Sequence, residues 1–176
     1  MKKVIYSIVV TIYAIIAVFT TVCLLSYNDY KVTQFGDYSL VIVSGELAKD
    51  NVNLNEGDLV IVNKKGDIKV GDQVFYYSQY EKTVTVASGK VTNIEKITST
   101  ETTYTIGDNY MVSSQYILGP VNGTTKVQSV GTVLNVLESQ WGFLFLVVFP
   151  SLLAFIYELT VVVGEIKGNK STKEGK

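Results

Sequence analysis

The chain has 176 residues, which leaves room for one modest folded domain beside two membrane spans. All 15 basic residues are lysines, so the chain lacks arginine, which makes bidentate contacts to phosphates and nucleobases. There is no histidine, which is the most frequent general base in catalysis and the most frequent metal ligand. The net charge of −1 conceals a central region, residues 28–139, with nine lysines against thirteen acidic residues, a balance of −4. These features argue against nucleic-acid binding, and we expect neither a metal nor another cofactor. The single cysteine, Cys23, cannot form an internal disulfide and is expected to fill space in an apolar environment.

Residues 1–27 predict an N-terminal transmembrane anchor. From Val4 to Leu25 no side chain is charged, and at about 1.5 Å per residue this run crosses a hydrocarbon core of about 30 Å. A cleaved signal peptide is the alternative, but the apolar run is too long for a signal-peptide core and no small-x-small cleavage pattern follows it. Tyr27 and Tyr30 would then lie at the membrane surface, where aromatic side chains favour the interface.

Residues 28–139 predict a mainly β, barrel-like extracytoplasmic domain between two transmembrane helices. Short runs rich in β-branched and aromatic residues are bounded by Gly, Asp and Asn, and no part of residues 38–135 shows a sustained helical period. Several short strands separated by turn signals are typical of a barrel-like all-β domain. The expected strands include residues 38–43, 59–62, 74–77, 83–87 and 104–106.

Glycine–aspartate pairs mark turns in this region. Glycine adopts backbone angles that other residues avoid, and the aspartate side chain caps the turn. The pairs are Gly57-Asp58, Gly66-Asp67 and Gly71-Asp72. Asn122-Gly123-Thr124 matches a glycosylation acceptor, but a turn explains it more simply.

Residues 140–164 predict a second transmembrane helix. The apolar run begins at Trp141 and ends at Val163. Pro150 is expected to kink the helix, which membrane helices tolerate. Glu158 lies within about two turns of the cytoplasmic end, where it either contacts a partner in the membrane or reaches the interface.

The distribution of lysines predicts the orientation of both anchors. Lys2 and Lys3 precede the first span, and residues 165–176, the predicted cytoplasmic tail, hold four lysines against two glutamates. Positive charge in short loops stays in the cytoplasm. We therefore expect a two-pass protein of the cell membrane with both ends in the cytoplasm and residues 28–139 outside. Lysine-only usage fits a low-GC genome, which favours a bacterial membrane.

Short motifs follow one another along the central region. They are Ser44-Gly45-Glu46, Gly57-Asp58, Gly71-Asp72, Gly107-Asp108-Asn109 and a G-x-V strand at Gly131-Thr132-Val133. Their order resembles the signal peptidase I family, especially its endoplasmic-reticulum and archaeal-like branch. This resemblance extends over nearly the whole chain and includes both anchors. It implies a membrane serine endopeptidase, a hydrolase, that removes signal peptides from exported precursor proteins.

The resemblance allows two alignments around the nucleophile. In one alignment Ser44 and Gly45 match the first two residues of the family's S-G-S-M motif, and Glu46 then replaces the nucleophile. In the other, Ser44-Gly45-Glu46 matches S-M-E, and Ser44 is the nucleophile. The proline that follows in the family is missing in both alignments, with Leu47 or Ala48 near its place.

The resemblance also implies a general base and a supporting carboxylate. With no histidine in the chain, a lysine has to serve, and it can do so only where burial lowers its pKa. Lys90 is the preferred base, and Lys82 is the second candidate. A strict match to the family's H-R pair instead places Gly89 at the position of the base, and the chain then has no general base. Asp108 matches the aspartate that supports a charged base.

Two functions therefore remain open. The first is a signal peptidase I-like endopeptidase with Ser44, Lys90 and Asp108 as catalytic residues. The second is a catalytically inactive relative that acts as a binding or accessory membrane subunit. Both predict the lipid bilayer, signal peptides and secretion-machinery subunits as partners. Ser44 follows the first anchor closely enough to lie near the outer membrane surface, where a β-lined groove could bind an extended peptide by strand addition. An unrelated two-span protein is the third interpretation.

Overall fold

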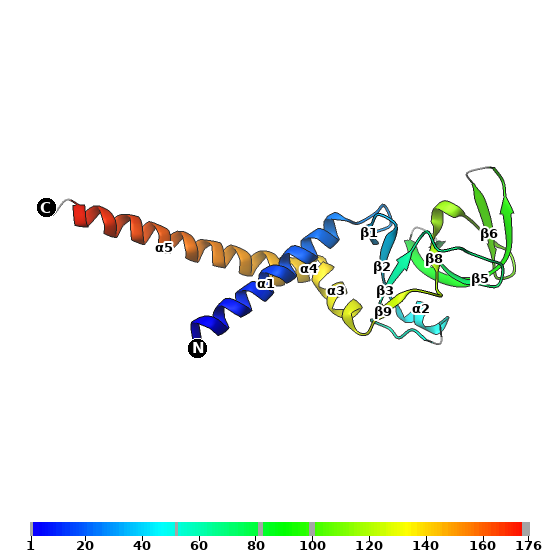
Figure 1. Ribbon diagram of the computed structural model, residues 1–176, viewed down its shortest axis with the longest axis horizontal. Helices are drawn as coiled ribbons and strands as arrows, with labels where there is room; N and C mark the ends of the chain where they lie inside the picture. The colour runs from blue at the N-terminus through cyan, green and yellow to red at the C-terminus, as the bar shows by residue number, and fades with distance from the viewer. Residues whose placement is uncertain (1, 52, 81–82, 99–100, 174–176) are drawn as a thin grey trace. The chain divides into compact units, whose positions relative to one another are not determined.

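A computed structural model describes residues 2–51, 53–80, 83–98 and 101–173 (Figure 1). Within these residues the chain has mixed α and β content, with two antiparallel sheets and helices toward both ends. It forms two compact units, Met1–Asn135 and Val136–Lys176. The first unit holds both sheets and the helix α1 (Lys2–Leu25).

The first sheet has four strands in the order β1-β2-β3-β9, and every pair is antiparallel. The predicted strands at residues 38–43 and 59–62 are confirmed as its central pair. Its two outer strands have three residues each and were not predicted, because so short a run gives no periodic signal. The strands are β1 (Thr33–Phe35), β2 (Tyr38–Ile42), β3 (Leu59–Asn63) and β9 (Thr125–Val127).

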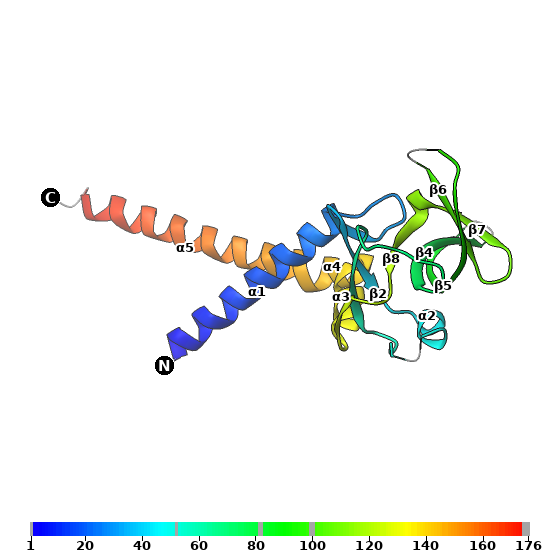
Figure 2. The same cartoon turned by 45° about the vertical axis from the view of Figure 1, so that its right-hand side comes forward.

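The second sheet has five strands in the order β7-β6-β5-β4-β8, again antiparallel (Figure 2). The predicted strands at residues 74–77, 83–87 and 104–106 are confirmed within longer strands. The strand that ends at Pro120 lies at the sheet edge, where a proline costs no ladder hydrogen bond. The elements are β4 (Gln73–Tyr80), β5 (Thr83–Lys96), β6 (Thr102–Ile106), β7 (Tyr110–Ser113), β8 (Ile117–Pro120) and the short 3₁₀ helix η1 (Ser114–Tyr116).

Strand β4 is buried on both faces and therefore joins two cores. Phe75 packs between the two sheets, whereas its neighbours Val74 and Tyr76 pack on the opposite face of β4. This alternation follows from the two-residue period of a strand. The core between the sheets consists of Val41, Val43, Leu47, Leu54, Val60, Val62, Phe75 and Leu118.

The outer face of the first sheet packs against helices. Cys23 of α1, Leu59 of β3 and Leu134 of helix α3 (Val130–Glu138) form one buried cluster. Cys23 has no exposed surface, so the expectation that it fills an apolar space is confirmed.

The predicted G-x-V strand at Gly131-Thr132-Val133 is wrong, because these residues lie in α3. Burial of Leu134 against the first sheet outweighs the strand preference of Thr132 and Val133. Gly131 is needed at this contact because a Cβ there would lie 2.5 Å from the backbone oxygen of Asp58.

The second unit is helical and contains the second apolar stretch. Helix α4 (Gln140–Phe143) is followed by a π-helix, η2 (Leu144–Val148), and by α5 (Phe149–Lys173). A proline at position 150 cannot donate to the carbonyl of Leu146 and crowds it, which explains an irregular turn at this place. Residues 165–173 of the predicted tail continue α5, and residues 174–176 lie outside the described part of the chain.

Two helical stretches in the described residues are long and apolar enough to cross a membrane. They are Ser7–Leu25, with 19 residues, and Gln140–Gly164, with 25 residues. Both coincide with the spans predicted from the sequence.

Candidate functional site

Ser44 lies at the start of a one-turn helix, α2 (Gly45–Lys49). Its Oγ accepts a hydrogen bond from the backbone N–H of Leu47 at 3.3 Å, which is the usual role of a serine N-cap. The side chain of Leu47 is 2% exposed and anchors the helix in the core between the sheets. The hydroxyl of Ser44 itself is on an exposed residue.

A cavity of about 600 Å³ lies beside this hydroxyl, and we call it the Ser44 cavity. Ser44 and Glu46 both line it, so the nucleophile positions of both alignments face the same space. The Glu56 carboxylate lies close to Gly45. A Cβ atom added to Gly45 would lie 3.2 Å from Oε2 of Glu56. The lining residues are Ile42, Ser44, Gly45, Glu46, Lys49, Glu56, Thr85 and Val86.

Lys90 and Asp108 lie near each other but apart from the Ser44 cavity. The carbonyl of Lys90 accepts a hydrogen bond from the Gly107 N–H at 3.0 Å, which places the turn carrying Asp108 beside this part of β5. Both side chains are exposed. The β5 residues that line the Ser44 cavity are Thr85 and Val86, and at about 3.3 Å per residue Lys90 is roughly 13–16 Å further along the strand.

Among the described residues, no hydrogen bond or ion pair joins the side chains of Ser44, Lys90 and Asp108. The alternative base position, Gly89, has no room for a side chain, because a Cβ would lie 2.4 Å from Cγ2 of Ile106. The second candidate base, Lys82, lies outside the described residues.

Lys49 is a lysine of the Ser44 cavity that the sequence reasoning missed. It is exposed, in the last turn of α2. A lysine acts as a general base when burial disfavours its charged form, and the position of Lys49 does not provide such burial. The cavity therefore presents a hydroxyl, two carboxylates and one ammonium group to solvent.

A second missed feature joins α2 to β5. The side-chain amide of Asn51, only 5% exposed, donates to the carbonyl of Leu47 at 2.8 Å and to Oγ of Ser88 at 2.7 Å. Gln73 also donates to Ser88, at 3.4 Å. Neutral polar residues in a turn and a strand give no catalytic signal in a sequence, although asparagine after a helix end is a known terminating residue. In the structure, this link joins the end of α2 to β5, and both elements contribute lining residues to the Ser44 cavity.

The glycine–aspartate motif forms the same turn twice. Asp58 accepts a hydrogen bond from the N–H three residues earlier, that of Asn55, at 3.0 Å; Asp72 accepts from Lys69 in the same way at 2.9 Å. The predicted capping by aspartate is thus confirmed at both positions. Gly57 and Gly71 have φ of +84° and +100°, which glycine tolerates better than other residues.

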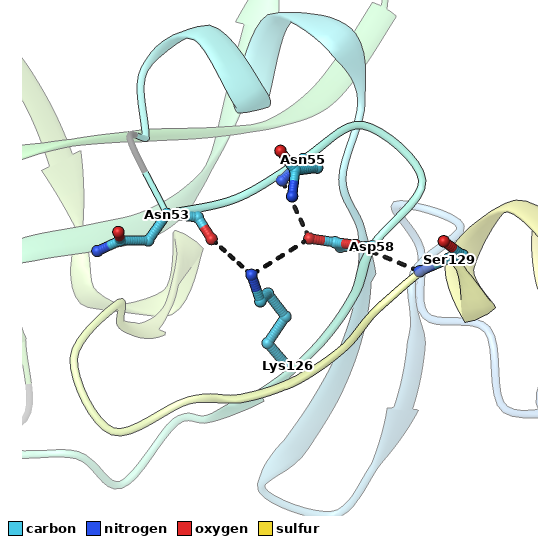
Figure 3. A network of polar contacts seen from close by, with 5 residues as sticks. All are labelled: Asn53, Asn55, Asp58, Lys126 and Ser129. Carbon is cyan, nitrogen blue, oxygen red and sulfur yellow. Dashed lines mark hydrogen bonds and ion pairs between the residues drawn. The ribbon is translucent and has the colours of Figure 1, made fainter.

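Asp58 is also the centre of a polar network (Figure 3). Its other carboxylate oxygen accepts a hydrogen bond from the Ser129 N–H at 3.2 Å. The Lys126 ammonium lies 3.7 Å from the oxygen that accepts from Asn55 and 2.8 Å from the carbonyl of Asn53. The N–H groups of Asn55 and Ser129 and the charge of Lys126 hold the pKa of this carboxyl below its usual value. The network ties the turn before β3 to β9 and to the start of α3, so Asp58 has a structural role.

The described residues contain no group of three or more His, Cys, Asp or Glu side chains that could hold a metal ion. No family model matches this chain, and searches of curated proteins and of solved structures gave no match.

Proposed function

We propose that this chain is a two-span membrane relative of signal peptidase I whose barrel-like exterior domain binds exported precursors without cleaving them. One observation favours binding over hydrolysis. The Ser44 cavity is lined by Glu46, Glu56 and Lys49, whereas Lys90 and Asp108 do not line it. A serine hydroxyl needs a base within reach to become a nucleophile, and no buried amine lines this cavity.

The size and lining of the Ser44 cavity suit an extended peptide. Its volume of about 600 Å³ accommodates a few residues, and Thr85 and Val86 of β5 form a β-lined wall. An extended segment bound beside a strand makes main-chain hydrogen bonds, and small pockets select its side chains. Signal peptides are the substrates that the resemblance implies.

The lysine distribution supports an orientation for this function. With both basic ends in the cytoplasm, the domain at residues 28–139 lies outside the cell membrane. α1 ends at Leu25, and Cys23 of its last turn packs against β3. The domain is therefore attached directly to its anchor, close to where exported chains emerge.

The second candidate is the serine endopeptidase with Ser44 as nucleophile. The observation that favours it is the exposed position of Ser44 at the Ser44 cavity. Accepting a hydrogen bond from Leu47 leaves the hydroxyl proton free for transfer to a base. This mechanism still requires an amine that reaches Ser44 when substrate is bound.

One assay separates the two candidates. The full chain in maltoside micelles is mixed with a labelled signal-peptide substrate, and fluorescence anisotropy measures binding while mass spectrometry measures cleavage. We expect saturable binding without cleavage, weakened by Thr85→Trp, which fills the Ser44 cavity. Thr125→Trp, an exposed threonine of β9 outside the cavity, is the matched control.

Turnover of the substrate would overturn the binding proposal. If both Ser44→Ala and Ser44→Asn abolish that turnover, the endopeptidase is the correct function; asparagine keeps the helix cap but offers no nucleophile. If the protein neither binds nor cleaves the peptide, both candidates fail.

A further inference from the structure

Four tyrosines from distant parts of the sequence line a second cavity of about 420 Å³. Tyr30 comes from the segment between α1 and β1, Tyr77 from β4, Tyr110 from β7 and Tyr116 from η1. We call this space the tyrosine cavity. It shares no lining residue with the Ser44 cavity, and the remaining lining residues are Gln79, Val84, Met111, Val112 and Ser113.

The tyrosine rings meet at different angles. The centroids of Tyr30 and Tyr77 are 4.3 Å apart with an interplanar angle of 34°, and Tyr30 meets Tyr116 edge-on at 6.1 Å and 68°. Tyr30 and Tyr77 therefore pack against each other, and rings in several orientations border the cavity. Such a wall can contact a rounded ligand from more than one side.

Asn28 holds two of these tyrosines in place. Its Nδ2 contacts the hydroxyl of Tyr77 at 2.6 Å, and its Oδ1 accepts the backbone N–H of Tyr30 at 2.9 Å. Burial raises the pKa of both Tyr30 and Tyr77, so both rings are neutral phenols at physiological pH. Asn28 therefore positions Tyr30 and Tyr77 in the aromatic wall without a ligand.

The lining chemistry selects the charge of the ligand. All nine lining residues are uncharged, so an anion would find no cationic partner here. Aromatic faces attract cations through the ring quadrupole, and residues 28–139 carry a net charge of −4. A small metal cation would lose its hydration without gaining charged ligands. An alkylated ammonium has an apolar surface and a weakly hydrated charge, which suits this wall.

We propose that the tyrosine cavity is a binding site for an alkylated ammonium group. This inference goes beyond the proposed function and does not depend on it. Tyr30 follows the end of α1 at Leu25 by five residues, a stretch that spans at most about 18 Å. The ammonium group can therefore belong to a lipid headgroup at the membrane surface or to a free organic cation.

Tetramethylammonium is the probe, and the control ligand is a neutral near-isostere, 2,2-dimethylpropanol, which has a central carbon in place of the nitrogen and one additional hydroxyl. The full chain in maltoside micelles is titrated with each at constant ionic strength, and tyrosine fluorescence and ring NMR signals report binding. We expect saturable binding of the cation and binding of the isostere that is about tenfold weaker, which corresponds to about 1.4 kcal/mol of cation–π attraction. Equal affinity for both would overturn the proposal, and so would the absence of saturable binding.

Variants locate the site. We expect Tyr30→Leu and Tyr116→Leu each to weaken tetramethylammonium binding about tenfold, whereas Tyr30→Phe keeps the ring face and most of the affinity. Tyr38→Leu is the matched control, because Tyr38 is an exposed tyrosine of β2 that does not line the cavity. Thermal melts of each variant establish folding. Unchanged binding in folded Tyr30→Leu and Tyr116→Leu would overturn the assignment of the site.

Reconstitution separates the two sources of the ammonium group. If lipid headgroups occupy the cavity, tetramethylammonium binds more weakly in phosphatidylcholine vesicles than in phosphatidylglycerol vesicles, because the headgroups compete. Equal affinity in both vesicles assigns the cavity to a free cation.

Discussion

The buried carboxylate of Asp58 connects three segments that are far apart in the sequence. Its oxygens accept the N–H groups of Asn55 and Ser129 and lie near the Lys126 ammonium, and the side chain is 3% exposed. Charge-assisted hydrogen bonds of this kind are stronger than neutral ones. The three segments are β9, the start of α3 and the turn that precedes β3. We therefore expect Asp58 to affect the stability of the fold more than it affects ligand binding at any site.

The stability of the first unit should therefore depend on pH through Asp58. The pKa of this carboxyl in the folded protein lies below its ordinary value of 3.8, chiefly because of the Asn55 N–H. The stabilisation is fully present above about pH 3.8 and is lost as the pH falls through the lower folded-state pKa. Urea unfolding followed from about pH 6 downwards measures this loss.

Asp58→Asn is the test of this assignment. The neutral amide removes the charge and directs an NH₂ group toward the N–H donors. Near neutral pH, the urea concentration at the unfolding midpoint should therefore be lower than in the wild type. The difference from the wild type should shrink as the pH falls below about 3.8. A difference that stays constant with pH would mean that the charge of Asp58 contributes nothing. Asp67→Asn, at an exposed glycine–aspartate pair, is the control.

At the candidate site, single residues were easier to predict than their arrangement. The motif Ser44-Gly45-Glu46 led to a residue that lines a real cavity, and the glycine–aspartate motif led to two identical turns. The distance from Ser44 to Lys90 could not be predicted, because it depends on which part of β5 faces α2. In the structure, Thr85 and Val86 are the β5 residues that line the Ser44 cavity, and Lys90 does not line it.

Among the elements, α2 depends most visibly on its cap. A helix of five residues is too short to be stable alone, so it relies on the Ser44 cap, the buried Leu47 and the Asn51 link. We expect Ser44→Ala to destabilise the first unit by about 1 kcal/mol. Ser44→Asn should remain close to the wild type, because asparagine caps helices as well as serine does. Equal destabilisation by both variants in urea titrations would contradict a capping role.

Helix α3 shows how packing overrides local preference. The resemblance implied a G-x-V strand at Gly131-Thr132-Val133, but Leu134 is buried against Leu59 and Cys23, and Gly131 lets the helix approach the backbone at Asp58. A sequence pattern without these long-range contacts could not reveal the helix.

Gly131→Ala is therefore expected to disturb the contact between α3 and the turn before β3. The added Cβ would lie 2.5 Å from the backbone oxygen of Asp58 and 2.8 Å from that of Gly57, and neither backbone atom moves easily. Overpacking of this kind costs about 1–3 kcal/mol, measurable by thermal unfolding. Gly164→Ala is the matched control in a helix, because its Cβ meets no atom within 4 Å. A small stabilisation is expected there, as alanine favours helices over glycine.

At the scale of the whole chain, the sequence predicted the long apolar helices best. An uninterrupted apolar run is a signal that needs no long-range contact, and both predicted spans coincide with the stretches Ser7–Leu25 and Gln140–Gly164. The π-helix before Pro150 was beyond such a prediction, because a proline indicates an irregularity but not its form. Orientation is a separate question, which rests on lysine counts and not on helix length.

Thiol labelling in intact cells tests that orientation. Wild-type protein should resist a membrane-impermeant maleimide in the folded state, because Cys23 is fully buried. Asn122→Cys introduces a thiol at an exposed position of the turn before β9, and Lys176→Cys introduces one at the C-terminal end. With both ends in the cytoplasm, intact cells should label the Asn122→Cys variant, and the Lys176→Cys variant should react only after permeabilisation. Labelling of Lys176→Cys in intact cells, with protection of Asn122→Cys, would reverse the topology and place the Ser44 cavity on the cytoplasmic side, out of reach of emerging exported chains.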